Sequence, residues 1–154
     1  MRKAVFPGSF DPFTLGHLDI VSRAMPLFDE IVIAIGINAD KKYMFTLDER
    51  LNFIRDTFQD NPKIKVATYH GLTALYCNEI GAKFILRGLR NTTDYNFEQS
   101  IAQTNLKIAE VESIFLLSTP EVSNISSTIV RDIMRYDGDY TSLVPKEVRK
   151  SKKK

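Results

Sequence analysis

Thr14 and His17 are the residues whose types and spacing most directly suggest chemistry, because two residues separate them in a T-x-G-H pattern. An apolar, strand-like run at residues 4–6 precedes them, and apolar positions at residues 18–25 follow at the spacing of a helix. Backbone N–H groups and the positive dipole end at the start of such a helix favour phosphate in the preceding turn. We therefore predict a phosphate site here, with Gly16 leaving room for a nucleotide. The alternative is that His17 bonds only its own backbone.

Two arginines, Arg87 and Arg90, come directly after the apolar run at residues 84–86. A cation at the end of a buried strand must pair with a carboxylate or face a charged ligand, and the fork of a guanidinium suits phosphate. For one of the two arginines, a salt bridge to Asp94 or Glu98 is the alternative. We expect this pair to add positive charge to the predicted phosphate site.

Three hydroxyl side chains, those of Ser126, Ser127 and Thr128, open another amphipathic stretch. One hydroxyl is enough to cap a helix, so the other two favour phosphate oxygens at the helix start. The apolar positions of this helix are expected to face the core, and these are Ile129, Ile133 and Met134.

Strand-like and helix-like stretches alternate along the chain, which predicts an α/β fold with a doubly wound, parallel, five-stranded, Rossmann-like sheet in a single domain. The strands are expected at residues 4–6, 31–35, 64–67, 84–86 and 114–117, and the helices after His17, from Leu47, at 73–80, at 94–108 and from Ser127. Thr46 and Glu49 have the spacing of a capping box, and Gly81 is expected to end the third helix. Ligands of such sheets bind beyond the carboxyl ends of the strands, so the three clusters above fall on one edge.

Length and composition agree with one domain. The chain has 154 residues, of which 44% are hydrophobic, and this is enough for one buried core. We place the domain at residues 1–148 and a basic tail at residues 149–154. No apolar run approaches the roughly 20 residues of a membrane span, and no signal peptide is evident. We therefore expect a cytoplasmic protein with no membrane partner.

Charge and cysteine content exclude other classes. The net charge of +2 depends on four lysines near the end of the chain, and residues 1–149 carry a net charge of −2. A slightly acidic body argues against nucleic acid as a partner. The single cysteine, Cys77, excludes an internal disulfide and is expected to be a buried thiol. With only two histidines far apart in sequence, we expect no dedicated metal site.

The T-x-G-H pattern resembles the T/H-x-G-H signature of the nucleotidyltransferase superfamily, which contains adenylyl- and cytidylyltransferases. Three further segments, at residues 41–50, 87–90 and 125–131, follow in the order of the branch that acts on 4′-phosphopantetheine in coenzyme A synthesis. The resemblance covers residues 2–148. It implies transfer of the adenylyl group of ATP to 4′-phosphopantetheine, giving dephospho-coenzyme A and pyrophosphate. The implied mechanism is direct in-line attack without a covalent enzyme intermediate.

This reaction needs positive charge and oriented N–H donors more than it needs a base. A phosphomonoester with a second pKa near about 6 is already largely dianionic at neutral pH. Charge builds on the nonbridging oxygens of the transferred group in the transition state. The sequence shows no evident Ser-His-Asp or paired-carboxylate arrangement, in agreement with this requirement.

The resemblance also implies roles for individual residues. The catalytic residues would be Thr14, His17, Lys41 and Arg87, with His17 on the α-phosphate. The ATP site would be formed by Ser9, Phe10, His17, Gly88, Leu89, Arg90, Glu98, Val122, Ser123, Asn124, Ile125, Ser126, Ser127 and Thr128. The acceptor site would be formed by Ser9, Lys41, Leu72, Thr73, Arg87 and Asn105, although Leu72 fits a core position equally well. Asp11 and Asp19 are expected to orient the turn rather than to act as acids.

Partners follow from the same resemblance: Mg²⁺ bound with ATP, a homohexamer, and coenzyme A as a feedback ligand. Nicotinamide mononucleotide adenylyltransferases and glycerol-phosphate-type cytidylyltransferases are the alternatives within the superfamily. The Arg-Gly-Leu-Arg segment and the lysines at 41–42 argue against both. A catalytically silent nucleotide-binding module is an alternative of another class. The presence of His17 with all of the cations argues against it, because binding alone does not need every transition-state contact.

Overall fold

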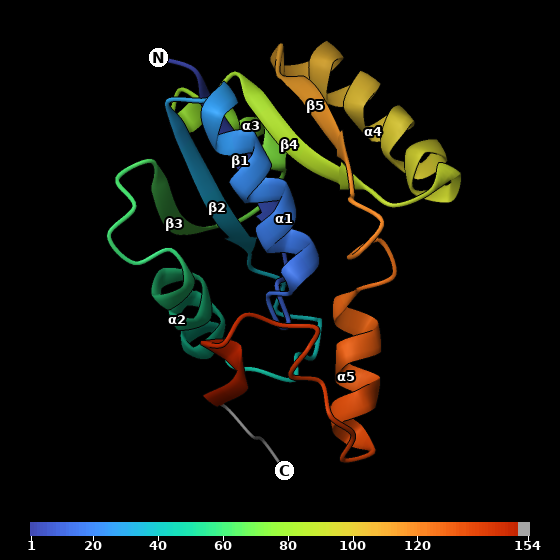
Figure 1. Cartoon of the computed structure of the whole chain (residues 1–154). Coiled ribbons are helices and arrows are strands. Elements are labelled where there is room, and N and C mark those ends of the chain that lie inside the picture. Colours follow the sequence, from blue (N-terminus) through green and yellow to red (C-terminus); the bar gives the residue numbers. More distant parts are fainter. Residues whose placement is uncertain (151–154) are drawn as a thin grey trace.

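The computed structural model describes residues 1–150 and shows the predicted alternation of strands and helices (Figure 1). The strands are β1 (Lys3–Gly8), β2 (Glu30–Gly36), β3 (Ile64–Tyr69), β4 (Phe84–Leu89) and β5 (Glu112–Leu117). All pairs are parallel, in the order β3-β2-β1-β4-β5. The fold class predicted from the sequence is therefore confirmed. The strand order reverses between β1 and β4, where such sheets form their ligand crevice.

Helices cover both faces of the sheet (Figure 1). On one face, α1 (Leu15–Ala24) and α2 (Leu47–Thr57) pack in a buried cluster that includes Ala4 and Phe6 of β1. On the other face, α3 (Thr73–Glu79) and α4 (Thr92–Ala109) share a cluster with Val5. Side chains of a strand alternate between the two faces, so one short strand supplies both cores. This double burial explains the continuous apolar run from which the strand was predicted.

The expected helix boundaries are present in the structure. Thr46 Oγ1 accepts a hydrogen bond from the Glu49 N–H at 3.2 Å, and Glu49 Oε2 accepts one from the Thr46 N–H at 2.8 Å. Gly81 follows α3 with a φ of +71°, a conformation that glycine adopts at little cost. The capping box and the glycine stop are therefore confirmed. Cys77 is buried in α3, as expected.

The segment after β5 forms a third cluster below the carboxyl ends of the strands (Figure 1). Here α5 (Ser127–Arg135) packs against Phe45, Phe53, Val144 and Val148. The prediction that Ile129 faces the core was wrong, because Ile129 is 46% exposed and Val130 is buried instead. Val130 and Met134 are four residues apart and share the buried face.

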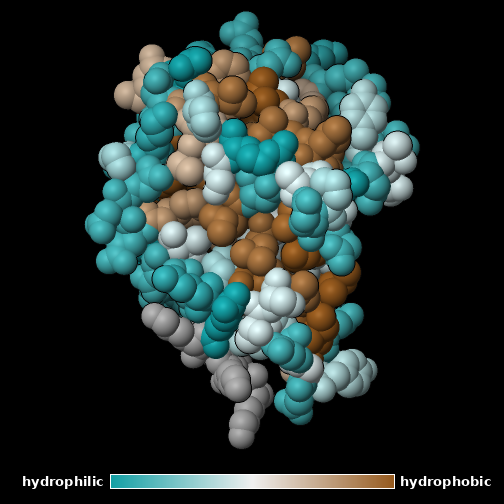
Figure 2. Space-filling model, in the orientation of Figure 1, coloured by the Kyte–Doolittle hydropathy of each residue, from teal (hydrophilic) through white to brown (hydrophobic). Residues whose placement is uncertain are grey.

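Val148, the last residue of the predicted domain, is fully buried, and the predicted boundary itself stays a prediction. Residues 151–154 of the predicted tail lie outside the described residues. No helix in residues 1–150 combines the length and the hydrophobicity that a membrane crossing requires. Figure 2 shows hydrophobic side chains at the surface over the middle and right of the face seen in Figure 1, where β5 and α5 lie. Leu117 at the end of β5 is 70% exposed.

Candidate active site

The turn between β1 and α1 fixes the histidine of the T-x-G-H pattern. Thr14 is the N-cap of α1, and its Oγ1 accepts a hydrogen bond from the His17 N–H at 3.4 Å. The Thr14 N–H in turn donates to Nδ1 of His17 at 3.0 Å. Because Nδ1 accepts this bond, the neutral ring carries its proton on Nε2. His17 therefore accepts the backbone N–H of Thr14 through one ring nitrogen and keeps an N–H donor on the other.

The surroundings of His17 keep the ring neutral. Its ring centroid lies 5.0 Å from that of Phe10, 5.2 Å from that of Phe13 and 6.2 Å from that of Phe6. Burial, together with the positive charges of Arg87 and Arg90, lowers the pKa of His17 from 6.5 to about 3. At neutral pH the ring is thus an uncharged hydrogen-bond donor.

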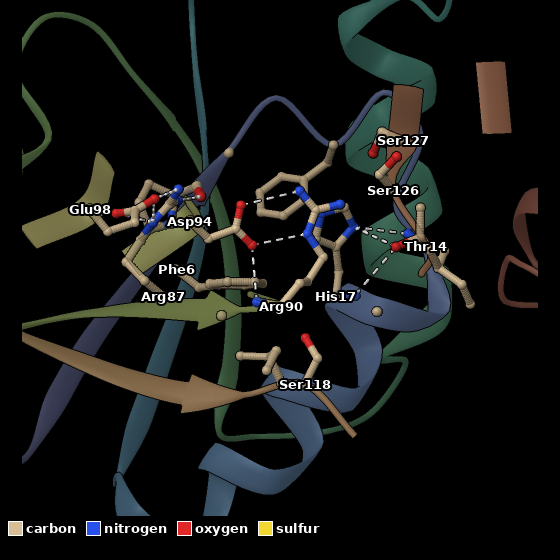
Figure 3. Close-up of a pocket in the computed structure, with 17 residues that line it drawn as sticks. Phe6, Thr14, His17, Arg87, Arg90, Asp94, Glu98, Ser118, Ser126 and Ser127 are labelled. Atoms are coloured by element: carbon tan, nitrogen blue, oxygen red, sulfur yellow. Dashed lines mark hydrogen bonds and ion pairs between the residues drawn. The ribbon is translucent and has the colours of Figure 1, made fainter. Parts of the chain in front are cut away.

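A first cavity of about 280 Å³ opens beside His17, between β1, β4 and the start of α5 (Figure 3). It brings together most residues of the ATP site predicted from the sequence. The predicted residues that line it are Phe10, Thr14, His17, Arg87, Gly88, Arg90, Glu98, Ile125, Ser126 and Ser127. Because these come from four separate segments, the fold assembles the motifs at the edge where they were expected.

Both arginines of this cavity are paired with carboxylates of α4. Nε of Arg87 lies 3.1 Å from each carboxylate oxygen of Glu98, and its Nη1 donates to the Pro7 carbonyl at 3.0 Å. Nε of Arg90 donates to Asp94 at 3.2 Å. From the sequence, such a salt bridge is the alternative for one of the two arginines, and in the structure each arginine forms one. In Figure 3 the Arg87–Glu98 pair, the Arg90–Asp94 pair and His17 lie in a row across the cavity.

A second cavity of about 750 Å³ lies on the other side of Arg87. It is lined by the predicted acceptor residues Ser9, Lys41, Thr73, Arg87 and Asn105. The two cavities share Pro7, Gly8, Arg87 and Glu98, so they adjoin at the end of β1. A ligand in one cavity can therefore meet a ligand in the other next to Arg87.

One side of the second cavity is formed by α4 and includes residues that sequence reasoning missed. Phe97, Ile101 and Asn105 line the cavity at intervals of four residues, which places them on one helix face. Phe97 is 70% exposed and Ile101 is 42% exposed. Only Asn105 was predicted. In the sequence, Phe97 and Ile101 form an apolar pair at i and i+4 ahead of Asn105. This pattern fits the wall of a cavity and a buried core face equally well.

The hydroxyls at the start of α5 bond to the protein itself. Ser126 Oγ accepts the Ile129 N–H at 3.2 Å and caps the helix. Ser127 Oγ donates to the Pro12 carbonyl at 2.8 Å, and Thr128 Oγ1 accepts from Arg131 at 3.2 Å. Ser127 thus holds α5 against the β1–α1 turn, whereas Thr128 bonds within α5 to Arg131, whose Nη1 donates to the Asp11 carbonyl at 2.8 Å. The backbone N–H groups of the helix start remain the donors best placed for an anion.

Of the two aspartates expected to orient the turn, Asp11 does so, whereas the bonds of Asp19 lie outside the turn. Asp11 is buried, and its two oxygens accept the N–H groups of Met44 and Phe45, each at 2.9 Å. Asp11 thereby holds the loop that carries Lys41 and Lys42 against the β1–α1 turn. Asp19 accepts from Arg23 at 3.0 Å and from the Thr119 N–H at 3.3 Å. Asp19 thus links α1 to the segment after β5.

Among the described residues, several predicted site residues line neither of these two cavities: Leu72, Leu89, Val122, Ser123, Asn124 and Thr128. Leu89 is buried, whereas Leu72 is 59% exposed, which excludes the core position that the sequence left open for it. The carbonyls of Val122 and Ile125 lie near Gly16, so this segment borders the first cavity through its backbone. Ser118 lines that cavity and was missed, although its place directly after β5 was a usable signal.

A family model described as cytidylyltransferase-like matches residues 5–133. A phosphopantetheine adenylyltransferase of Flavobacterium psychrophilum is 59% identical over 149 residues, covering 97% of this chain and 99% of the relative. One of Leuconostoc citreum is 48% identical, covering 96% of this chain and 94% of the relative.

A solved structure, a putative nicotinate-nucleotide adenylyltransferase from Vibrio parahaemolyticus, is similar with a TM-score of 0.72. It is 17% identical, and the match covers 97% of this chain and 91% of that one. At this identity the likeness shows the fold alone.

Proposed function

The chain belongs to the phosphopantetheine adenylyltransferase family, and from this we propose that its two cavities hold ATP and 4′-phosphopantetheine for adenylyl transfer. The products are dephospho-coenzyme A and pyrophosphate. The observation that carries the proposal is the junction at Gly8 and Arg87, where the smaller and the larger cavity adjoin. Two phosphorylated substrates can meet there beside a guanidinium and an uncharged histidine donor.

ATP occupies the smaller cavity in this proposal. The N–H groups at the start of α5, the free N–H groups of Arg90 and Nε2 of His17 are the donors that support phosphate binding there. The larger cavity, with the apolar side chains of Phe97 and Ile101 and the polar Asn105, suits a pantetheine arm. Lys41 and Arg87 then bind the terminal phosphate of that arm.

The reaction needs no covalent enzyme intermediate. A phosphate oxygen of 4′-phosphopantetheine forms a bond to the α-phosphorus of ATP, while the bond from that phosphorus to the oxygen bridging to the β-phosphate breaks. Pyrophosphate leaves with that oxygen and the electron pair. His17 donates from Nε2 to the α-phosphate, where negative charge grows. Because its pKa of about 3 keeps the ring neutral, its contribution is a fixed donor and not proton transfer.

Magnesium enters as part of the substrate. Within residues 1–150, no group of three or more His, Cys, Asp or Glu side chains is placed to hold a metal ion. Mg²⁺ commonly binds through substrate phosphates with few protein ligands. We therefore propose that MgATP is the form bound, and that Mg²⁺ neutralises charge on the phosphates.

A homohexamer and feedback by coenzyme A complete the proposal. Exposed apolar side chains, such as those of Leu117, Leu106 and Ile108, support an oligomer in which they are buried between subunits. A mass measurement in solution tests the oligomeric state. Coenzyme A carries the same pantetheine arm as the acceptor, so the larger cavity is its proposed site. The cytoplasmic location remains a prediction.

A panel of phosphate acceptors tests the proposed function. The purified protein is incubated with MgATP and, in turn, 4′-phosphopantetheine, nicotinate mononucleotide, nicotinamide mononucleotide and glycerol 3-phosphate. Pyrophosphate release is followed, with CTP replacing ATP in a parallel series. Release with ATP and 4′-phosphopantetheine alone supports the proposal, whereas preference for another acceptor overturns it.

A further inference from the structure

Tyr43, in the loop between β2 and α2, lies between Lys41 of the same loop and Arg50 of α2. The Arg50 guanidinium carbon lies 4.0 Å from the centroid of the Tyr43 ring, and Nζ of Lys41 lies 5.5 Å from the same centroid. Both distances are within the range of an attractive cation–π contact. The ring thus connects a buried arginine to the lysine that is proposed to bind the acceptor phosphate.

Arg50 is a rigid support for this ring. It is 4% exposed, its Nε donates to the Phe45 carbonyl at 3.2 Å, and its Nη1 donates to the Ser9 carbonyl at 3.0 Å. Within residues 1–150 it forms no ion pair. Burial lowers the pKa of Arg50, but a guanidinium stays charged in proteins. The π face of Tyr43 therefore lies against a cation that is held in place by backbone carbonyls.

Lys41, in contrast, is exposed and needs a means of being oriented. Its Nζ lies 3.5 Å from Ser9 Oγ, at the limit of a hydrogen bond. A lysine stem has many rotamers, so fixing it on ligand binding costs conformational entropy. A ring that already attracts the ammonium group reduces this cost before the ligand arrives.

Both cations contact Ser9. Arg50 bonds the Ser9 carbonyl, while Lys41 approaches the Ser9 hydroxyl. Tyr43 lines the acceptor cavity and also a smaller pocket of about 300 Å³ beside it, and both cavities include Ser9 and Lys41. The ring is therefore placed to set the position of the ammonium group relative to the acceptor site.

We propose that Tyr43 is a positioning residue, whose ring rests on Arg50 and holds the Lys41 ammonium beside Ser9 for the phosphate of 4′-phosphopantetheine. This rests on the proposed function of the larger cavity. The aromatic face is what matters, so phenylalanine is expected to replace tyrosine, while leucine of similar bulk is not.

The test is calorimetric titration of the full chain with 4′-phosphopantetheine and, separately, with MgATP. We expect Tyr43→Leu to weaken 4′-phosphopantetheine binding by about fivefold. MgATP binding should be unchanged, and Tyr43→Phe should bind both ligands as the wild type does. Tyr136→Leu is the matched control, because Tyr136 is 87% exposed and lines neither cavity.

A second comparison separates positioning from general damage to the loop. In a Lys41→Ala background, Tyr43→Leu should cause no further loss of 4′-phosphopantetheine affinity, because the group that it orients is gone. Additive losses overturn the proposal, as does a failure of Tyr43→Phe to restore binding or an equal loss of MgATP affinity.

Binding of 4′-phosphopantetheine by the wild type distinguishes a failure of the proposed function from a failure of the proposed role of Tyr43. If it does not bind 4′-phosphopantetheine, the proposed function fails and the role of Tyr43 fails with it. If it binds and Tyr43→Leu binds equally well, only the role of Tyr43 is overturned.

Discussion

Arg87 and Glu98 form a two-oxygen ion pair at the place where the two cavities adjoin. Nε of Arg87 lies 3.1 Å from both carboxylate oxygens, while Nη1 is held by the Pro7 carbonyl. The Glu98 side chain is only 10% exposed and that of Arg87 is 33% exposed. The carboxylate therefore fixes the plane of the guanidinium in advance of any ligand, and N–H groups not used in these bonds remain for a phosphate.

Replacing Arg87 by lysine tests this fixed geometry. Arg87→Lys keeps the charge but cannot bond Glu98, Pro7 and a phosphate together, because an ammonium group has no planar fork. We expect affinity for 4′-phosphopantetheine to fall by about tenfold or more, which is the cost of one charged hydrogen bond. Calorimetry measures it, with the exposed Arg149→Lys as control. An unchanged affinity would show that only charge matters at this position.

The His17→Ala variant separates binding from turnover. Because the Nε2 donor is proposed to act on charge that develops in the transition state, turnover should fall by at least about a hundredfold. The dissociation constant for MgATP should stay nearly the same. Steady-state kinetics and calorimetry on one preparation provide the two values. Equal losses in both would make His17 a ground-state binding residue.

The depressed pKa of His17 also predicts a pH dependence of stability. The folded protein holds the ring neutral with a pKa of about 3, whereas the unfolded chain has the ordinary value of 6.5. The unfolded state therefore binds the proton more readily, and the contribution of His17 is complete above 6.5 and is lost as the pH falls toward 3.

Urea unfolding measures this contribution. Between about pH 7 and about pH 5, the wild type should lose about 1–2 kcal/mol more unfolding free energy than His17→Gln. The carboxylates titrate in both proteins and so cancel in the comparison. The same loss in the two proteins would mean that His17 has an ordinary pKa in the folded state.

Because the two cavities are proposed to hold different ligands, mutations beside each cavity should weaken the binding of different ligands. Lys41→Ala should weaken 4′-phosphopantetheine more than ATP. The double variant Ser127→Ala with Thr128→Ala should do the reverse, because Ser127 bonds the β1–α1 turn and Thr128 bonds Arg131, which donates to the Asp11 carbonyl. Each lost charged hydrogen bond costs on the order of 1.5 to 3 kcal/mol. Ser100→Ala on the exposed face of α4 is the control. A Lys41→Ala protein with weakened ATP binding and normal 4′-phosphopantetheine binding would reverse the assignment.

The sequence was sufficient for the fold and for the edge of the sheet that carries the site. Apolar runs with helical stretches between them identify each strand, and the capping box at Thr46 identifies the start of α2. Motifs that directly follow strands must meet at one edge in a parallel sheet, so Thr14, Arg87 and Ser126 could be placed together.

Side-chain partners could not be predicted in the same way. Whether Arg87 or Arg90 is ion-paired depends on the rotation of α4 against β4, and periodicity does not determine this rotation. The same uncertainty explains Phe97 and Ile101, which line a cavity although their spacing equally fits a buried face. It also explains Ile129 and Leu72, which are exposed where a core position was considered. The two interpretations of His17 are compatible, because Nδ1 accepts the Thr14 N–H and the proposed contact with phosphate uses Nε2.

The most direct measurement of adenylyl transfer follows the α-phosphorus of ATP. The protein is incubated with MgATP labelled at that phosphorus and with 4′-phosphopantetheine, and the label is located after separation of protein and nucleotides. We expect the label to appear in dephospho-coenzyme A, unlabelled pyrophosphate to form in equal amount, and the protein to carry no label. Label bound covalently to the protein, or its absence from dephospho-coenzyme A while ATP is consumed, would contradict direct transfer at the junction of the two cavities.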